Sequence, residues 1–283
     1  MDLLKQFLLV LPLSTASWAT TASCVTTMAL SNIGLGTGNG CYTVDQTYSN
    51  FGVGNAGGSP VQSSSTVDIT GSSTWASDAS PWVNTVIFSG NTGANSNTPA
   101  PWTAATGQVA GSIFFDTNST QAYFPVSGYP TGGPLLIDSV GLSATASYIG
   151  TPGTIYAFVF EFFCVGAGNC STGATGNEIT LEEQFESGFP ALYSCSYAST
   201  SANAGATCST VGASSSPITV TLNTPEPTLF VTNNFVVRAT GGVTSATLTN
   251  FSDIFGNEEV PEPSTFALLG AGLGAAAWLR RRK

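Results

Sequence analysis

From Cys41 to Phe251 the chain is a succession of short alternating or β-branched runs, separated by glycine, asparagine, serine and proline. Successive side chains of a strand point to opposite faces, so this alternation indicates strands that bury one face. Only 8% of the residues are charged, a balance typical of exported β-proteins with many turns. The pattern predicts an all-β fold, a single antiparallel β-sandwich or jelly-roll-like domain over residues 20–251.

The alternation also predicts where the strands lie. The run from Ile155 to Phe163 is the most apolar in the body and is expected to be central, with Tyr156, Phe158, Phe160 and Phe162 on one core-facing side. Residues 252–259 are expected to be a linker. Strands are expected over residues 42–51, 61–69, 83–88, 108–115, 121–124, 135–148, 154–164, 179–185, 191–199, 218–222, 229–240 and 246–251.

The cations are concentrated at the two ends of the chain. Lys5 is near the start, four cations form the C-terminus, and Arg238 stands alone between them. Of the sixteen acidic residues only Asp2 lies outside residues 20–279, which leaves fifteen carboxylates beside one cation. Such a field repels phosphate backbones, so nucleic acid is excluded as a partner. Arg238 is expected to form a structural ion pair with one of the carboxylates.

Residues for the common catalytic sites are missing. The chain has no histidine and the body has no lysine, which excludes Ser-His-Asp, Cys-His and Ser-Lys arrangements. The acidic run at Glu178, Glu182, Glu183 and Glu186 is split by strand alternation over two faces and is expected to be a solvated edge, with a weak Ca²⁺ site as the alternative. Glu161 is the one carboxylate whose pKa burial is expected to raise. We expect no cofactor and no catalytic residue.

The sequence also bears on sugar binding and on metal binding. Trp75, Trp82 and Trp102 lie in a stretch rich in proline, serine and glycine, where they form either a sugar-stacking platform or a cap on the sandwich core. No C-x2-C pair and no histidine is present, so no metal site is expected.

Six cysteines are an even number in a chain that carries export signals, and they predict disulfides. Sequence proximity favours three local pairs, each closing a short loop, although six cysteines allow fifteen connectivities. The favoured pairs are Cys24 with Cys41, Cys164 with Cys170, and Cys195 with Cys208.

The N-terminus has the features of a signal peptide. A weakly basic start is followed by a short apolar stretch from Phe7 to Leu13 and by small residues before Ala19. We expect cleavage after Ala19, with residues 1–19 as the signal peptide. Lipidation at Cys24 is the alternative.

The C-terminus has the features of a sorting tail. Ser264 to Leu279 contains no charged residue and is followed by Arg280, Arg281, Arg282 and Lys283. As a helix these sixteen residues span about 24 Å, short against a hydrocarbon core of about 30 Å. The basic end predicts a tail inserted with its cations on the cytoplasmic side and the body on the other side.

The residues before this helix carry a family resemblance. Val260, Pro261, Glu262 and Pro263 are followed by the apolar stretch and the basic end, in the order and spacing of the PEP-CTERM sorting signal of Gram-negative, exopolysaccharide-producing bacteria. The chain resembles that family over residues 260–283. The resemblance implies export, transient insertion in the inner membrane, and processing by exosortase, a membrane protease-transpeptidase. The same kind of tail occurs on some ice-binding proteins.

Three functions follow as hypotheses. The first is a non-enzymatic, surface-delivered protein of the extracellular polysaccharide or biofilm matrix. The second is a module that binds carbohydrate, cells or an ice surface. The third is a carboxylate-dependent hydrolase, which requires two acidic side chains that converge in an open cleft.

Overall fold

A computed structural model describes residues 22–33, 39–54, 63–75, 82–119, 135–165, 178–197, 208–209 and 217–259. Within these ranges almost all regular structure is β, with one short helix, α1 (Leu30–Ile33), and one 3-10 turn, η1 (Ser64–Thr66). The strands are β1 (Ala22–Ser23), β2 (Met28–Ala29), β3 (Gly40–Tyr42), β4 (Gln46–Gly54), β5 (Val67–Trp75), β6 (Trp82–Asn91), β7 (Pro99–Ala100), β8 (Trp102–Ala104), β9 (Gly107–Ser119), β10 (Leu135–Gly150), β11 (Ile155–Val165), β12 (Glu178–Glu186), β13 (Leu192–Tyr197), β14 (Cys208–Ser209), β15 (Ile218–Glu226), β16 (Thr228–Ala239) and β17 (Val243–Glu259).

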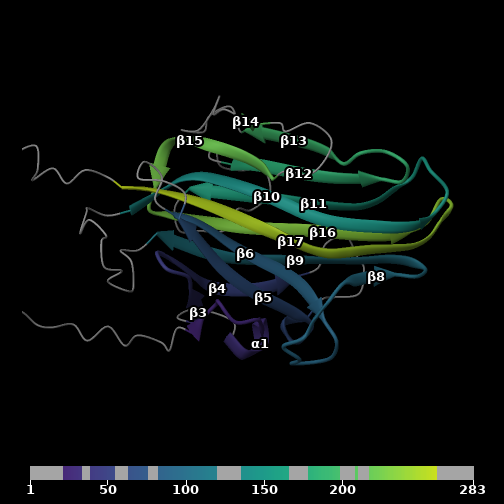
Figure 1. Cartoon of the computed structure of the whole chain (residues 1–283), viewed down its shortest axis with the longest axis horizontal. Coiled ribbons are helices and arrows are strands. Elements are labelled where there is room, and N and C mark those ends of the chain that lie inside the picture. The colour runs from purple at the N-terminus through teal and green to yellow at the C-terminus, as the bar shows by residue number, and fades with distance from the viewer. Residues whose placement is uncertain are drawn as a thin grey trace, which may run out of the picture.

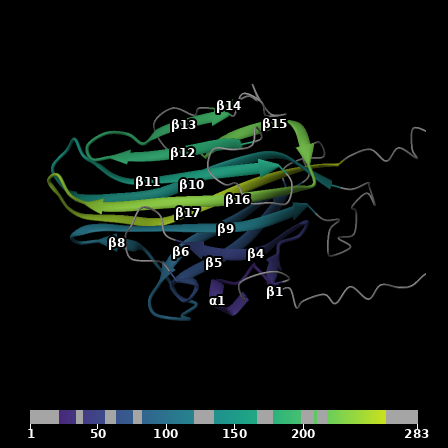
Figure 2. The same cartoon turned by 180° about the vertical axis from the view of Figure 1, so that it is seen from behind.

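The strands form two sheets that lie one over the other, as Figures 1 and 2 show from opposite sides. The first sheet has the order β1-β3-β4-β9-β16-β11-β12-β13. The second has the order β14-β15-β10-β17-β6-β5-β2, with β7 added beside β6 and β8 beside β17. Neighbouring strands are antiparallel, except for a two-residue parallel pairing of β1 with β3. The predicted all-β fold with two antiparallel sheets is confirmed.

The chain changes sheet repeatedly after β9. Strand β10 belongs to the second sheet, β11 to β13 to the first, β14 and β15 to the second, β16 to the first and β17 to the second. The turn between β10 and β11 contacts the turn between β16 and β17, where the Thr151 N–H donates to the Gly242 carbonyl at 3.0 Å. Gly242 has φ +101°, and a Cβ there would lie 2.2 Å from Thr151 Oγ1, so glycine is required.

The core fills the space between the sheets and is rich in aromatic rings. Phe115 of β9 lies within 5.4 to 5.9 Å, between ring centroids, of Phe51 and Tyr48 from its own sheet and Phe88 from the other. Phe255 of β17 contacts Tyr48, Phe115 and Phe163 at 6.0 to 6.4 Å. All six phenylalanine and tyrosine side chains are nearly or completely buried, so these contacts join the two sheets.

Three predicted segments differ from the structure. The strand expected over residues 42–51 is interrupted at residues 43–45, between β3 and β4. Residues 252–259 were expected to be a linker, but β17 continues through them to Glu259, and Asp253, Phe255 and Asn257 have no exposed surface. The polar composition of this segment suggested a linker, whereas its alternation places every second side chain in the core. Strand β5 begins at Val67 rather than at residue 61, because η1 precedes it.

Other predictions fall outside the described residues. These are the signal peptide at residues 1–19, the strand at 121–124 and the sorting tail at 260–283. In the part of the chain that is described, no helix combines the length and the apolar character needed to cross a membrane.

Candidate functional site

The sorting motif and the basic end follow the last described residue. The strand that leads to them, β17, lies inside the second sheet between β10 and β6. Its final register positions align Glu258 with Leu136 and Glu259 with Leu135. In Figure 1 the end of β17 is coloured yellow. The motif beginning at Val260 therefore follows a paired strand directly.

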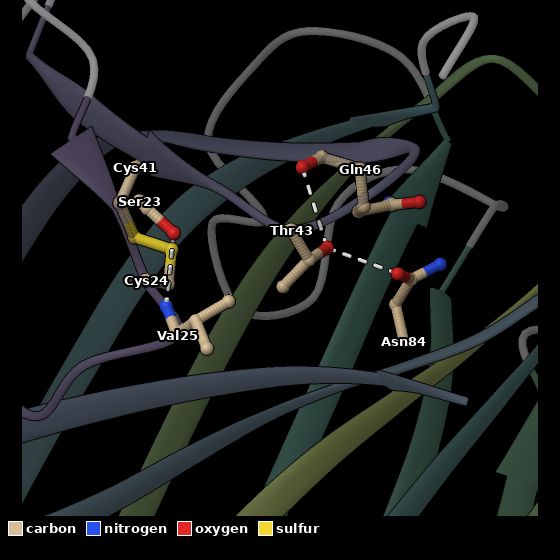
Figure 3. Close-up of a disulfide and its surroundings, with 7 residues drawn as sticks. All are labelled: Ser23, Cys24, Val25, Cys41, Thr43, Gln46 and Asn84. Carbon is tan, nitrogen blue, oxygen red and sulfur yellow. Dashed lines mark hydrogen bonds between the residues drawn. A yellow bond between two sulfur atoms is a disulfide. The ribbon is translucent and has the colours of Figure 1, made fainter. Parts of the chain in front are cut away.

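A disulfide fixes the start of the domain. Cys24 and Cys41 are bonded, with Cα atoms 5.2 Å apart and a sequence separation of 17 residues, and both side chains are fully buried (Figure 3). The Cys24 carbonyl accepts a hydrogen bond from the Gly71 N–H at 2.6 Å, which ties the bridge to β5 of the second sheet. The predicted pairing of Cys24 with Cys41 is confirmed.

The other cysteine predictions remain predictions. Cys164 and Cys195 are disulfide-bonded. Their expected partners are Cys170, which lies outside the described residues, and Cys208, whose side chain is not described.

A buried polar network lies beside the disulfide. The Asn84 side chain on β6 donates from Nδ2 to Asp45 Oδ1 at 2.7 Å and accepts hydrogen bonds from Thr43 Oγ1 at 2.9 Å and Ser73 Oγ at 2.6 Å. Figure 3 shows Thr43 between Asn84 and Gln46, whose carbonyl oxygen is 3.4 Å from the Thr43 hydroxyl. Burial raises the pKa of Asp45, and hydrogen bonds from Asn257 and Asn84 partly oppose this effect.

Gln46 extends the network across the two sheets. Its Oε1 accepts from Asn257 Nδ2 of β17 at 3.0 Å, and its Nε2 donates to the Thr117 hydroxyl of β9. All three side chains are fully buried. Asn257 lies in the segment expected to be a linker, so the network locks the last part of β17 to the opposite sheet.

Two carboxyl groups meet at the centre of the sandwich. Glu161 of β11 and Asp253 of β17, named here the central acid pair, come from opposite sheets and have no exposed surface. Asn233 of β16 donates from Nδ2 to Asp253 Oδ2 at 2.6 Å. Burial raises the pKa of Glu161 well above its ordinary value, and the negative charge of Asp253 raises it further. The predicted rise in the pKa of Glu161 is confirmed.

The acidic run on β12 divides as predicted. Ile179, Leu181, Glu183 and Phe185 face the interior, and Thr180, Glu182, Gln184 and Glu186 face outward. Glu183 is therefore an inward-facing group rather than part of a solvated edge, and its Oε2 accepts from the Ala144 N–H at 2.7 Å. Burial raises the pKa of Glu183 to about 7, while hydrogen bonds from Ala144 and Tyr193 partly oppose this.

A strip of aromatic rings runs along the outer face of the first sheet. Phe158, Phe160 and Phe162 of β11 are half-buried there, while Ala157, Val159, Glu161 and Phe163 point inward. The expectation that all four even-numbered aromatics face the core is wrong for these three, and only Tyr156 is buried, because the register with β12 shifts between Ile155 and Ala157. We call Phe158, Phe160, Phe162, Phe114 and Phe230 the outer aromatic strip.

The strip has polar neighbours on the adjacent strands. Phe160 pairs with Asn234 of β16 and Glu182 of β12, and Phe162 pairs with Thr232 and Thr180 on the same strands. Phe160 and Phe162 are nearly parallel, with centroids 6.4 Å apart and planes at 16°. Phe114 and Phe230 form a second stacked pair at 6.2 Å. The outer face thus alternates rings with hydrogen-bonding side chains.

The structure also corrects the expectations for Arg238 and Trp102. The Arg238 guanidinium lies 5.1 Å from the Phe158 ring centroid and donates from Nε to Gln108 Oε1 at 3.0 Å, so its described partners are not carboxylates. Trp102 is only 4% exposed and packs 4.4 Å from Phe235 and 5.7 Å from Phe251. It caps the core and is unavailable for stacking on a sugar. The side chains of Trp75 and Trp82 are not described.

The described residues contain no group of three or more histidine, cysteine, aspartate or glutamate side chains placed to hold a metal ion. The carboxyls that do converge, Glu161 and Asp253, have no exposed surface, so they do not meet the open-cleft requirement of a glycoside hydrolase.

Sequence reasoning missed most of the interior polar groups. Asp45, Asn84, Asn233, Asp253 and Asn257 are fully buried, yet only Glu161 was singled out. A usable signal exists for two of them, because Asp253 and Asn257 alternate with Phe251 and Phe255 on one face of β17. No comparable signal identifies the partners, which are 20 to 211 residues away in sequence.

Comparison with known families matches residues 259–283 to the PEP-CTERM protein-sorting motif. Neither a curated protein nor a solved structure matches the chain. The motif confirms the resemblance carried by Val260 to Pro263 and the basic end. It supports an exported protein of the cell envelope that is recognised by an exosortase membrane enzyme.

Proposed function

We propose that this protein is a non-enzymatic component of the extracellular polysaccharide or biofilm matrix, delivered to the surface of a Gram-negative bacterium after exosortase removes or exchanges its tail. The observation that carries the proposal is the PEP-CTERM motif at residues 259–283, placed directly after the β-sandwich. A sandwich held by a disulfide suits an oxidising compartment outside the cytoplasm.

The carboxyls that converge among the residues described by the structure are buried, which supports a non-enzymatic role. The sequence has no histidine, and the acids that converge inside the sandwich are closed to substrate. The matrix role is inferred from the sorting route, because the tail directs the protein to the cell envelope and so toward the polysaccharide outside it.

The sorting route is tested by changing the motif in the producing cell. We expect Pro261→Ala combined with Glu262→Ala to leave uncleaved protein in the inner membrane and to reduce the matrix fraction at least tenfold. Glu258→Gln, one residue before the matched region, is the control and should be sorted like the wild type. Fractionation and mass spectrometry of the mature C-terminus measure both results.

Equal distribution of the double variant and the wild type would overturn the sorting step. The matrix role has its own readout, the mass and cohesion of the biofilm in a strain lacking the protein. An unchanged biofilm, with correct sorting of the wild type, would overturn the matrix role alone.

A second candidate function is glycan binding through the outer aromatic strip. Sugar rings present C–H groups that stack on aromatic faces and hydroxyls that need hydrogen-bond partners. Phe160 and Phe162 supply the rings, and their pairing with Asn234, Glu182 and Thr232 supplies the polar partners. The fifteen carboxylates of residues 20–279 repel acidic polymers, which favours a neutral glycan.

Glycan binding is tested with Phe160→Ala and Phe162→Ala on neutral and uronic-acid polysaccharides. We expect each variant to weaken binding to a neutral polysaccharide about tenfold, the effect of losing roughly 1.4 kcal/mol. Ile149→Ala removes an exposed apolar side chain on the second sheet and is the matched control. Retained binding in both phenylalanine variants, or no binding by the wild type, would exclude this candidate.

A further inference from the structure

The central acid pair lies where neither sheet gives access to water. In the first sheet, Glu161 is paired with Leu181 on one side and Asn233 on the other. In the second, Asp253 is paired with Leu142 and Val86. Each carboxyl therefore comes from a strand with neighbours on both sides. Two residues further along each strand, Phe163 and Phe255 are in contact, with ring centroids 6.2 Å apart. No exposed surface remains on Glu161 or Asp253.

The pair is short of hydrogen-bond donors. Asn233 supplies one, to Asp253 Oδ2. Among the described residues nothing donates to Asp253 Oδ1 or to either oxygen of Glu161. Arg238 cannot supply the missing positive charge, because it lies on the outer face over Phe158. The body has no lysine and the chain no histidine to replace it.

Two ionised carboxylates in contact within a core are strongly unfavourable, because each loses its hydration and each repels the other. A single proton held by the pair reduces both the desolvation cost and the repulsion, since a neutral carboxyl can donate a hydrogen bond to the partner carboxylate. Asp253 already accepts from Asn233, which favours the charged form on Asp253 and the neutral form on Glu161. This assignment satisfies Asp253 Oδ1 without any additional residue.

We propose that Glu161 and Asp253 share one proton, with Glu161 as the neutral donor and Asp253 as the acceptor, and that this hydrogen bond clips the two sheets together until alkali removes the proton. Because this hydrogen bond lies in the core, it makes the free energy of unfolding depend on pH through a buried group and not through surface charges. The inference is independent of the sorting route and of the matrix role.

The groups around the central acid pair also favour its protonated form. On the first sheet, Tyr48 of β4 faces Asp253, and burial together with the charges of Asp45 and Asp253 raises its pKa, so it stays neutral. Further buried or inward titratable groups on that side are Asp45, Tyr156, Glu183 and Tyr193, and burial raises the pKa of each. The inward side chains of the described β6, β9 and β16 are not ionisable, and β10 contributes Tyr148, which packs against Tyr156 with ring centroids 4.9 Å apart.

The sign of the pH dependence follows from these shifts. The pKa of Glu161 lies well above 4.5, and burial raises that of Asp253 from 3.8 to about 7. Protons are thus bound more tightly in the folded state than in the unfolded state. The contribution of both groups to stability is complete below about pH 4. Asp253 loses its own proton as the pH rises through about 7, which leaves the one proton shared with Glu161, and this proton is lost only at higher pH.

The test is the pH profile of thermal unfolding for the wild type, Glu161→Gln and Glu182→Gln. Glutamine keeps the shape of the neutral carboxyl and carries its own N–H donors toward Asp253, so Glu161→Gln retains the clip at all pH values. We expect its Tm to match the wild type within about 2 °C at pH 5 and to exceed it by about 4 °C or more at pH 9. Glu182→Gln removes the same charge from the outer face and should follow the wild-type profile.

A direct readout accompanies the profile. The infrared difference spectrum of the wild type minus Glu161→Gln at pH 8, above the pKa of about 7 of Glu183 and Asp253, should contain the C=O band of a buried neutral carboxyl, and this holds even if the variant folds poorly. Parallel pH profiles for all three proteins, or the lack of such a band, would overturn the proposal. So would stabilisation of the wild type, and not of Glu161→Gln, by CaCl₂ at pH 9, because the pair would then hold a cation in place of a proton.

Discussion

Phe255→Ala is expected to lower the free energy of unfolding by about 3–5 kcal/mol, the range for truncating a fully buried phenylalanine. The ring has no exposed surface and contacts Tyr48, Phe115 and Phe163, all from the opposite sheet. Removing it leaves a cavity between the sheets that the three rings cannot all close. Urea unfolding at pH 5 measures the change as a lower midpoint with an unchanged slope.

The control for this prediction is Phe189→Ala, in the turn after β12. Phe189 is 60% exposed, so its truncation should change the free energy of unfolding by less than about 0.5 kcal/mol. A loss below about 1.5 kcal/mol for Phe255→Ala would contradict the placement of residues 252–259 in the core. The experiment thus distinguishes a buried strand from a linker.

Removing the Cys24–Cys41 disulfide is the second change for which a large loss of stability is expected. The double variant Cys24→Ser with Cys41→Ser is expected to lose about 3 kcal/mol, because a bridge with a separation of 17 residues restricts the unfolded chain by about that amount. Both sulfurs are buried, so the serine hydroxyls add a further desolvation cost. Urea unfolding under oxidising conditions, with the other disulfides intact, measures the difference.

The double variant avoids the free thiol that either single change would leave. Val25→Ala is the matched control, since Val25 is adjacent to the bridge and 61% exposed. Stability within about 1 kcal/mol of the wild type would show that the bridge adds little to the contacts that β1 and β3 make without it.

The alternation of apolar and polar residues was sufficient to predict most strands and to assign the two faces of β12, because each of those strands has one apolar side. It failed for β11, where both sides are apolar. Phe158, Phe160 and Phe162 looked more like core than the row containing Glu161, yet the inward row is the one with the acid. Period-two alternation separates two faces but does not say which one meets the other sheet.

The interior polar groups show a different limit. Asp45 reaches Asn84 across 39 residues, and Gln46 reaches Asn257 across 211. Local pattern contains no information on such partners, so each residue appears in the sequence as an ordinary polar residue of a turn or strand. Only the arrangement of the sheets shows that these groups satisfy one another inside the core.

Because β17 leads directly to the tail, the tail begins at one defined end of the sandwich. Strand β17 runs without interruption from Val243 to Glu259, which places the turns at residues 150–154 and 240–242 about 50 Å from the point where the tail begins. The residue next to the sorting motif and these turns therefore lie at opposite ends of the sandwich. An enzyme that acts at the motif therefore meets the end of the sandwich that is farthest from these turns.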